Sequence, residues 1–157
     1  MVGCQGRPVR MLLVDDDPSM LKLVRTIVEQ SFPEQIHVEV AEDPRVARRM
    51  IESTPVDIVV TDMEMPGING LEIVRCAKRR NAYTQVLMLT GHSTVDLLLD
   101  AMELGATDYL LKPLNKEELV VVLTETMNRL CRWRKALSNT YATKQRAAPE
   151  PLSQFAI

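Results

Sequence analysis

Five polar side chains follow the short apolar runs of this sequence, at the points where buried strands would end: Asp15, Asp16, Asp62, Thr90 and Lys112. In an open parallel sheet the ligand site forms at the carboxyl ends of the strands, so these groups are expected to converge on one crevice. Clustered carboxylates repel one another, and a hard divalent cation such as Mg²⁺ removes that conflict. The sequence therefore predicts a magnesium site.

The same cluster can carry out phosphoryl transfer. With the cation bound, Asp62 can attack a phosphoryl donor as a carboxylate nucleophile and form an acyl phosphate. Mg²⁺, the ammonium of Lys112 and the hydroxyl of Thr90 would share the charge that builds on the transferred oxygens.

Five apolar runs alternate with longer amphipathic segments, which predicts βαβ units around a parallel sheet covered on both faces. The expected strands are Met11–Val14, His37–Ala41, Ile58–Thr61, Val86–Thr90 and Tyr109–Leu111. The helices between them have start signals at Asp17-Pro18, Asp43-Pro44, Asn69 and Ser93, and Gly105 indicates the end of the fourth. Asp57, Asp96 and Asp108 are interpreted as cap or turn residues.

The last helix is expected to begin near Asn115 and to extend beyond the domain. Its apolar positions step by three and four residues, a coiled-coil-like stripe with one polar interruption: Leu119, Leu123, Thr126, Leu130, Trp133 and Leu137. From about Asn139 the sequence offers little to bury, so fraying or disorder is expected there. We expect a flexible N-terminus at residues 1–8, a domain at 9–130 and a helical extension with a basic, disordered tail at 131–157.

Composition indicates one aliphatic α/β domain, because 46% of the residues are hydrophobic and only 4% are aromatic. Residues 1–128 hold 13 basic and 20 acidic side chains, whereas residues 129–146 hold six basic ones and no acid. The three cysteines are far apart and form no CxxC pair, which argues against a disulfide framework or a zinc site. Without a membrane-span-length apolar run or targeting segment, a cytoplasmic location is expected.

Four motif blocks appear in order along the chain: Val14-Asp15-Asp16, Asp62 to Gly70, Leu89-Thr90-Gly91, and Gly105 to Pro113. Together they resemble the CheY-like receiver domain of two-component response regulators over roughly residues 9–130. The resemblance implies a flavodoxin-like (βα)5 fold with strand order 2-1-3-4-5. It also implies a switch protein and not an enzyme, whose own chemistry is limited to self-phosphorylation and self-dephosphorylation.

The resemblance implies a role for each matching residue. Asp62 would be the phosphoacceptor, Asp16 a direct Mg²⁺ ligand, Asp15 a ligand mainly through water, and the backbone carbonyl of Glu64 a further ligand. Lys112 would pair with the phosphate, in a cis linkage to Pro113. Thr90 and Tyr109 would be the switch residues: Thr90 would bind the phosphate and Tyr109 would turn inward.

Glu64 and His92 each lie two residues beyond a key group, Asp62 and Thr90. In the family these positions flank the phosphate, so we expect this pair to set the rate of dephosphorylation.

The fourth and fifth helices each contain a run of three apolar residues, Leu97-Leu98-Leu99 and Val120-Val121-Val122. No helix buries three consecutive positions on one stripe, so some of these side chains must face outward. The resemblance places both runs on the surface that phosphorylation would change, formed by the fourth helix, the fifth strand and the fifth helix. We expect Leu97, Leu98, Val121 and Val122 to form an interaction surface. The expected partners are a sensor histidine kinase or phosphotransfer protein, and a second copy bound through the fourth and fifth helices or the C-terminal helix. Direct nucleic-acid binding is not expected, because six cations without a DNA-binding fold are a weak signal.

Two other functions use a similar sheet. A haloacid-dehalogenase-type phosphatase would place its nucleophile at Asp15, but this chain has no insertion to build a substrate cap. A flavodoxin-like FMN carrier would need a phosphate-binding loop, whereas the first loop here is acidic.

Overall fold

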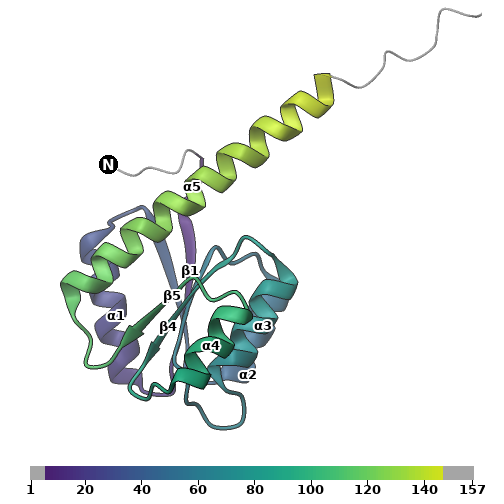
Figure 1. The fold of residues 1–157 in the computed structure, drawn as a ribbon. Coiled ribbons are helices and arrows are strands. Elements are labelled where there is room, and N and C mark those ends of the chain that lie inside the picture. Colours follow the sequence, from purple (N-terminus) through teal and green to yellow (C-terminus); the bar gives the residue numbers. More distant parts are fainter. Residues whose placement is uncertain (1–5, 147–157) are drawn as a thin grey trace, which may run out of the picture.

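A computed structural model describes residues 6–146. Five helices alternate with five strands: β1 (Val9–Val14), α1 (Pro18–Ser31), β2 (Ile36–Ala41), α2 (Pro44–Ser53), β3 (Ile58–Thr61), α3 (Gly70–Arg80), β4 (Gln85–Thr90), α4 (Val95–Glu103), β5 (Asp108–Leu111) and α5 (Lys116–Arg146). All strand pairs are parallel, in the order β2-β1-β3-β4-β5 (Figure 1). The predicted fold class and strand order are confirmed.

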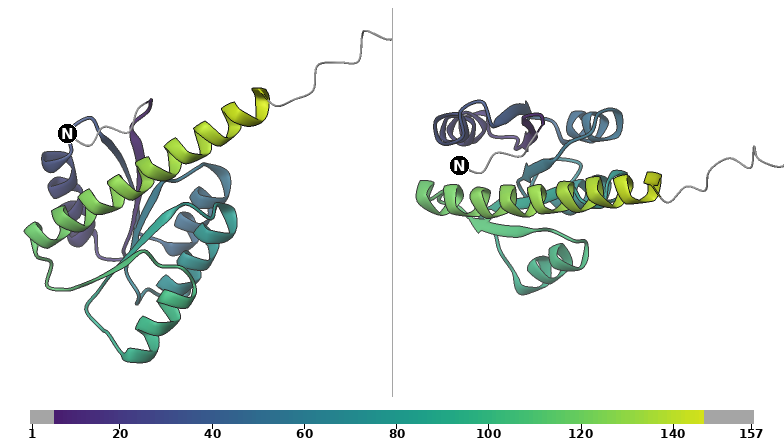
Figure 2. Two further views of the ribbon diagram at one scale, coloured as in Figure 1. Left: turned by 45° about the horizontal axis from the view of Figure 1, so that its top comes forward. Right: turned by 90° about the horizontal axis from the view of Figure 1, so that it is seen from above.

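Helices cover both faces of the sheet (Figure 2). Along β1, Met11 and Leu13 pack with α1 and α5, whereas Leu12 and Val14 pack with α2, α3 and α4. This alternation follows from the two-residue period of a strand, and both faces are apolar because both are covered. The two cores hold the sheet rigid, so its carboxyl edge presents the polar side chains in fixed positions.

Most predicted helix starts are confirmed. Asp17, Asp43 and Asn69 each accept a hydrogen bond from a backbone N–H of the following helix, with Pro at the first helical position of α1 and α2. The prediction for α4 is wrong by one residue: Thr94, and not Ser93, is the N-cap, because its hydroxyl accepts from the N–H of Leu97. Gly105, at φ 93°, ends α4 as expected.

The last helix reaches farther than expected. It begins after Asn115, whose side chain accepts from the N–H of Glu118, and continues past Asn139 to Arg146. Figure 1 shows its second half projecting beyond the body. The remainder of the predicted tail, and residues 1–5 of the predicted flexible N-terminus, lie outside the described residues. None of the helices within residues 6–146 combines the length and apolar character needed to cross a bilayer.

The cysteines differ in state. Cys76 is a free, partly buried thiol, and burial raises its pKa. Cys131 is disulfide-bonded, so the expectation that the cysteines form no disulfide is wrong at this position. Cys4 lies outside the described residues.

Candidate functional site

The predicted acidic cluster forms at the carboxyl edge of the sheet. Asp15 follows β1 and Asp62 follows the adjacent β3; the backbone N–H of Asp62 donates to the carbonyl of Val14, which fixes the two loops side by side. One carboxylate oxygen each from Asp15, Asp16 and Asp62 lie within 4.8 Å of one another. Asp15 and Asp62 are buried and Asp16 is exposed, so the cluster opens to solvent through Asp16.

Lys112 reaches this cluster from the end of β5. Its Nζ lies 2.9 Å from Asp15 Oδ2 and 3.3 Å from Asp62 Oδ2. Burial acts to lower the pKa of Lys112, but the hydrogen bond to Asp15 and the charges of both carboxylates outweigh it and raise that pKa. Lys112 therefore remains an ammonium beside Asp62, and its peptide bond to Pro113 is cis, as expected.

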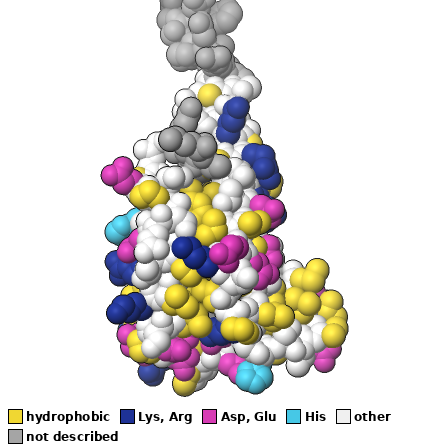
Figure 3. Space-filling view, turned by 90° about the vertical axis from the view of Figure 1, so that its left-hand side faces the viewer, with side chains coloured by type: hydrophobic (Ala, Val, Ile, Leu, Met, Phe, Trp, Pro, Cys, Tyr) yellow, Lys and Arg dark blue, Asp and Glu magenta, His cyan; other side chains and the backbone are white. Residues whose placement is uncertain are grey.

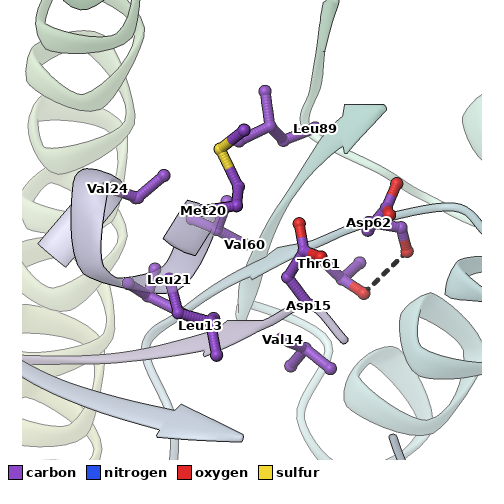
Figure 4. A pocket seen from close by; sticks show the side chains of 10 residues that line it. All are labelled: Leu13, Val14, Asp15, Met20, Leu21, Val24, Val60, Thr61, Asp62 and Leu89. Carbon is purple, nitrogen blue, oxygen red and sulfur yellow. Dashed lines mark hydrogen bonds between the residues drawn. The ribbon is translucent and has the colours of Figure 1, made fainter. Parts of the chain in front are cut away.

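Main-chain groups hold the carboxylates in place. Asp15 Oδ1 accepts from the N–H of Asp17 at 2.9 Å, and Asp62 Oδ1 accepts from the N–H of Met63 at 2.7 Å. Figure 4 shows Asp15, Thr61 and Asp62 beside the apolar side chains that line the same small cavity, of about 10 Å³. This space beneath the carboxylates holds at most about one water molecule, so any larger group must bind on their outer side.

Three carboxylates this close together fit a hard divalent cation, because such cations prefer several oxygen ligands. Lys112 offsets only part of the charge of Asp15, Asp16 and Asp62. The donor set thus suits Mg²⁺, with Asp16 on the solvent side.

Thr90 and Tyr109 meet at one backbone group. The Thr90 side chain is buried, and its hydroxyl donates to the carbonyl of His92 at 3.2 Å while accepting from the His92 N–H at 3.2 Å. The Tyr109 hydroxyl donates to the same carbonyl at 3.3 Å. The two predicted switch residues are thereby joined through the loop that leads into α4.

Glu64 and His92, singled out by their spacing, contact each other. Glu64 Oε2 lies 3.0 Å from His92 Nδ1, and both side chains are exposed. The contact joins the loop after β3 to the loop after β4, beside the acidic cluster. A groove of about 480 Å³ next to it is lined by Met63, Glu64, Met65, Pro66, Asn69 and Leu97.

The predicted interaction residues are exposed to different degrees. Val121 is exposed, whereas Leu97 and Val122 pack partly against the core and Leu98 is half-buried. The most exposed apolar side chains of α4 are instead Val95, Leu99 and Met102, which the triplet alone does not indicate.

Sequence reasoning missed two residues. A Cβ on Gly70 would collide with the carbonyl oxygen of Asp62 and lie 2.9 Å from Met63 Cα, so only glycine lets α3 begin this close to the Asp62 loop. The available signal was the glycine directly after the Asn69 cap.

The second is Asp57, which was interpreted as a turn residue. It is instead a buried ion-pair centre: its carboxylate contacts Arg7 at 3.0 Å, the N–H of Arg10 at 2.8 Å and Arg134 at 2.8 Å. The Arg134 contact is an ion pair and not an aligned hydrogen bond. No sequence spacing links residues this far apart.

Comparison with known proteins agrees with this geometry. The family model described as the response regulator receiver domain matches residues 11–124. The chain belongs to the response regulator receiver family. It is a receiver domain of the kind found in two-component response regulators, in which signalling through a phosphorylated aspartate is typical, and the family implies kinase or phosphotransfer partners.

Receiver relatives include transcriptional regulators. TrcR of Mycobacterium tuberculosis is 36% identical over 124 residues, covering 79% of this chain and 47% of TrcR. FixJ of Azorhizobium caulinodans is 31% identical, covering 74% of this chain and 54% of FixJ. The chain spans about half the length of these curated relatives. The chemotaxis protein CheY4 of Vibrio cholerae is a structural neighbour with 29% identity and a TM-score of 0.68, covering 76% of this chain and 98% of CheY4.

Proposed function

We propose that Asp62 is the phosphoacceptor of this receiver domain and takes its phosphoryl group from a sensor histidine kinase or a phosphotransfer protein. The supporting observation is the convergence of Asp15, Asp16 and Asp62 with Lys112 at one edge of the sheet. An Asp62 carboxylate oxygen forms the new P–O bond, the P–N bond of the donor phosphohistidine breaks, and its electron pair stays on the imidazole nitrogen.

Mg²⁺ is the proposed cofactor: Asp16 would hold it directly, Asp15 mainly through water, and Asp62 and the backbone carbonyl of Glu64 would be further ligands. When bound, it neutralises charge on the phosphoryl oxygens and on the acidic cluster. The Lys112 ammonium shifts from its contact with Asp15 toward the phosphoryl group, and its raised pKa keeps it charged. These groups favour the charge distribution of the transition state.

The switch begins when the Thr90 hydroxyl leaves the His92 backbone for a phosphoryl oxygen. Tyr109, whose hydroxyl shares the His92 carbonyl with Thr90, then turns inward into the space that Thr90 leaves, so the start of α4 and the β5 residue Tyr109 respond together. We propose that this changes the α4–β5–α5 surface, which includes Leu97, Leu98, Val121 and Val122, and that it controls a partner, dimerisation or an output domain.

Beyond phosphoryl transfer to itself, the proposed chemistry is only self-dephosphorylation, with Glu64 and His92 setting its rate. The observation that supports this role is their exposed contact at 3.0 Å, which joins the loop after Asp62 to the loop after Thr90. We place these reactions in the cytoplasm.

The experiment compares wild type with Asp62→Asn after addition of BeF₃⁻ and Mg²⁺, with backbone NMR of α4 and β5 as the readout. BeF₃⁻ forms a phosphoryl mimic on an aspartate, so wild-type signals of His92 and Tyr109 are expected to shift while those of Asp62→Asn stay in place. Equal shifts in both proteins, or none in wild type, would overturn the proposal.

A further inference from the structure

Two neighbouring helices concentrate positive charge on one side of the molecule. α2 and α3 together carry seven cations and two acids, although the whole chain has a net charge of −2. The cations are Arg45, Arg48 and Arg49 on α2 and Arg75, Lys78, Arg79 and Arg80 on α3. The remainder of the chain is therefore negative overall. In Figure 3, which shows the side on which α1 lies in Figure 1, Lys and Arg are instead interspersed with Asp and Glu.

A groove of about 470 Å³ runs between these two helices. It is lined by Arg48 and Glu52 from α2 and by Glu72, Arg75, Arg79 and Arg80 from α3. Arg80 Nε donates to the carbonyl of Glu52 at 3.2 Å, which joins the two helices near their ends. From Glu72 to Arg80 the groove follows α3 for about 12 Å, at about 1.5 Å per residue. It shares no residue with the acidic cluster or with the α4–β5–α5 surface, so it is separate from the site of the proposed function.

Two arginines of this groove have no counter-charge. Within residues 6–146, no carboxylate pairs with Arg75 or Arg79, whereas the neighbouring Arg48 pairs with Glu52 at 3.1 Å. Arg75 and Arg79 are exposed and lie four residues apart, a spacing at which like charges on one helix face repel each other. Arg79 lies in the last turn of α3, where a cation offsets the helix dipole, but Arg75 does not. A bound anion would remove the repulsion between them.

The pattern of charge suits carboxylates carried by a helix. A guanidinium group binds one carboxylate through two parallel hydrogen bonds. Glutamates four residues apart on a partner helix have the same rise between them, about 6 Å, as Arg75 and Arg79. The exposed Glu72 lies three residues before Arg75 and would pair with a cation of the same partner. The complementary helix is therefore acidic, with a cation beside its carboxylates.

Longer polyanions fit this surface less well. A nucleic acid or an anionic membrane extends beyond the groove and would meet the rest of the chain, which is negative overall. A continuous row of phosphates would also approach Glu52 and Glu72 inside the groove. A short helix contacts the groove alone, and at physiological ionic strength charges more than about 8 Å away from it are largely screened.

We propose that the groove between α2 and α3 binds a short acidic helix of a partner protein. Arg75 and Arg79 pair with two of its carboxylates, and Arg48 adds positive charge from the opposite wall. Binding requires no phosphoryl group on Asp62, because the proposed switch acts on α4, β5 and α5. The groove thus goes beyond the proposed function, as a docking surface that is present in either state of the switch.

The test uses a synthetic, alanine-rich helical peptide of about 15 residues, with glutamates four residues apart on one face and one lysine beside them. At low salt, backbone NMR signals of Arg48, Arg75 and Arg79 are expected to shift, with a Kd below about 1 mM that rises on addition of salt. Arg75→Gln with Arg79→Gln should raise the Kd about tenfold or more. Lys22→Gln with Arg25→Gln removes the same charge from exposed positions of α1 and should change the Kd less than about twofold.

A second peptide of the same composition, with its glutamates scattered around the helix, should bind more weakly than the first. Absence of saturable binding, equal effects of the two double variants, or equal binding of the two peptides would overturn the proposal. Tighter binding of a DNA duplex of about 15 base pairs, or of phosphatidylglycerol vesicles, with the same dependence on Arg75 and Arg79, would also overturn it. So would a dimer of the protein alone that Arg75→Gln with Arg79→Gln abolishes, because a second copy would then occupy the groove.

Discussion

Thr90 and Tyr109 share one hydrogen-bond acceptor, the backbone carbonyl of His92, at 3.2 and 3.3 Å. Thr90 is buried at the carboxyl end of β4, while Tyr109 lies on the neighbouring β5. A change at the cluster that draws Thr90 away therefore alters the loop that starts α4 without moving the sheet.

Tyr109→Phe removes one of these two hydrogen bonds. Because the bond is partly exposed, the free energy of unfolding should fall by about 1 kcal/mol or less. Asp62 should still be phosphorylated, but the BeF₃⁻-induced shifts of α4 backbone signals should become smaller. Shifts in α4 as large as those of wild type would exclude a role for the Tyr109 hydroxyl in the switch.

From the contact between Glu64 and His92 we predict that an acyl phosphate on Asp62 survives longer than it would without these two side chains. Replacing both residues by alanine should speed dephosphorylation about fivefold, equivalent to roughly 1 kcal/mol of barrier, because water gains access. The loss of labelled phosphate with time measures this rate. Arg25→Ala with Glu29→Ala removes an exposed ion pair on α1 and serves as control; an unchanged lifetime in the Glu64, His92 variant would refute the assignment.

Gly70 sets the position of the Asp62 loop. In Gly70→Ala the new methyl group meets the backbone of Asp62 and Met63, so the loop must shift, at a cost of about 1–3 kcal/mol, and phosphorylation should slow. Thermal unfolding and phosphate incorporation measure both effects. Gly91→Ala is the control, because its Cβ would meet only Lys112 Cβ, at 3.9 Å; equal effects of the two substitutions would contradict the explanation.

Asp57 lies directly before β3, at the opposite end of this strand from the acidic cluster. Asp57→Ala leaves Arg134 without its partner, and the free energy of unfolding should fall by about 3 kcal/mol, the low end for a buried pair, since Arg7 is half-exposed. Urea unfolding measures the loss, and Asp43→Ala, at an exposed helix cap, should cost less. Phosphorylation of the folded variant should remain normal, and its loss would show that the anchor influences the distant site.

The strands, their order and the acidic cluster could be predicted from the sequence. Strand periodicity and helix caps are local signals, and the strand order follows from the family that the motif blocks resemble. Asp57 could not be predicted, because its partners Arg7 and Arg134 come from opposite ends of the chain. The exposed face of α4 was also missed: the Leu97-Leu98-Leu99 triplet does not reveal which position turns outward, and the helix rotation places Leu99 there with Val95 and Met102. Thr94, and not Ser93, is the N-cap of α4. The sequence could not distinguish them, because both are hydroxyl residues and both give the same N-cap signal.

The most direct measurement locates the phosphoryl group after treatment with acetyl phosphate and Mg²⁺. Peptide mass spectrometry, with hydroxylamine cleavage to confirm an acyl phosphate, is expected to place a single label on Asp62, to find none in Asp62→Asn, and to find none when Mg²⁺ is removed. A label on Asp15, or a label that persists in Asp62→Asn, would contradict the account.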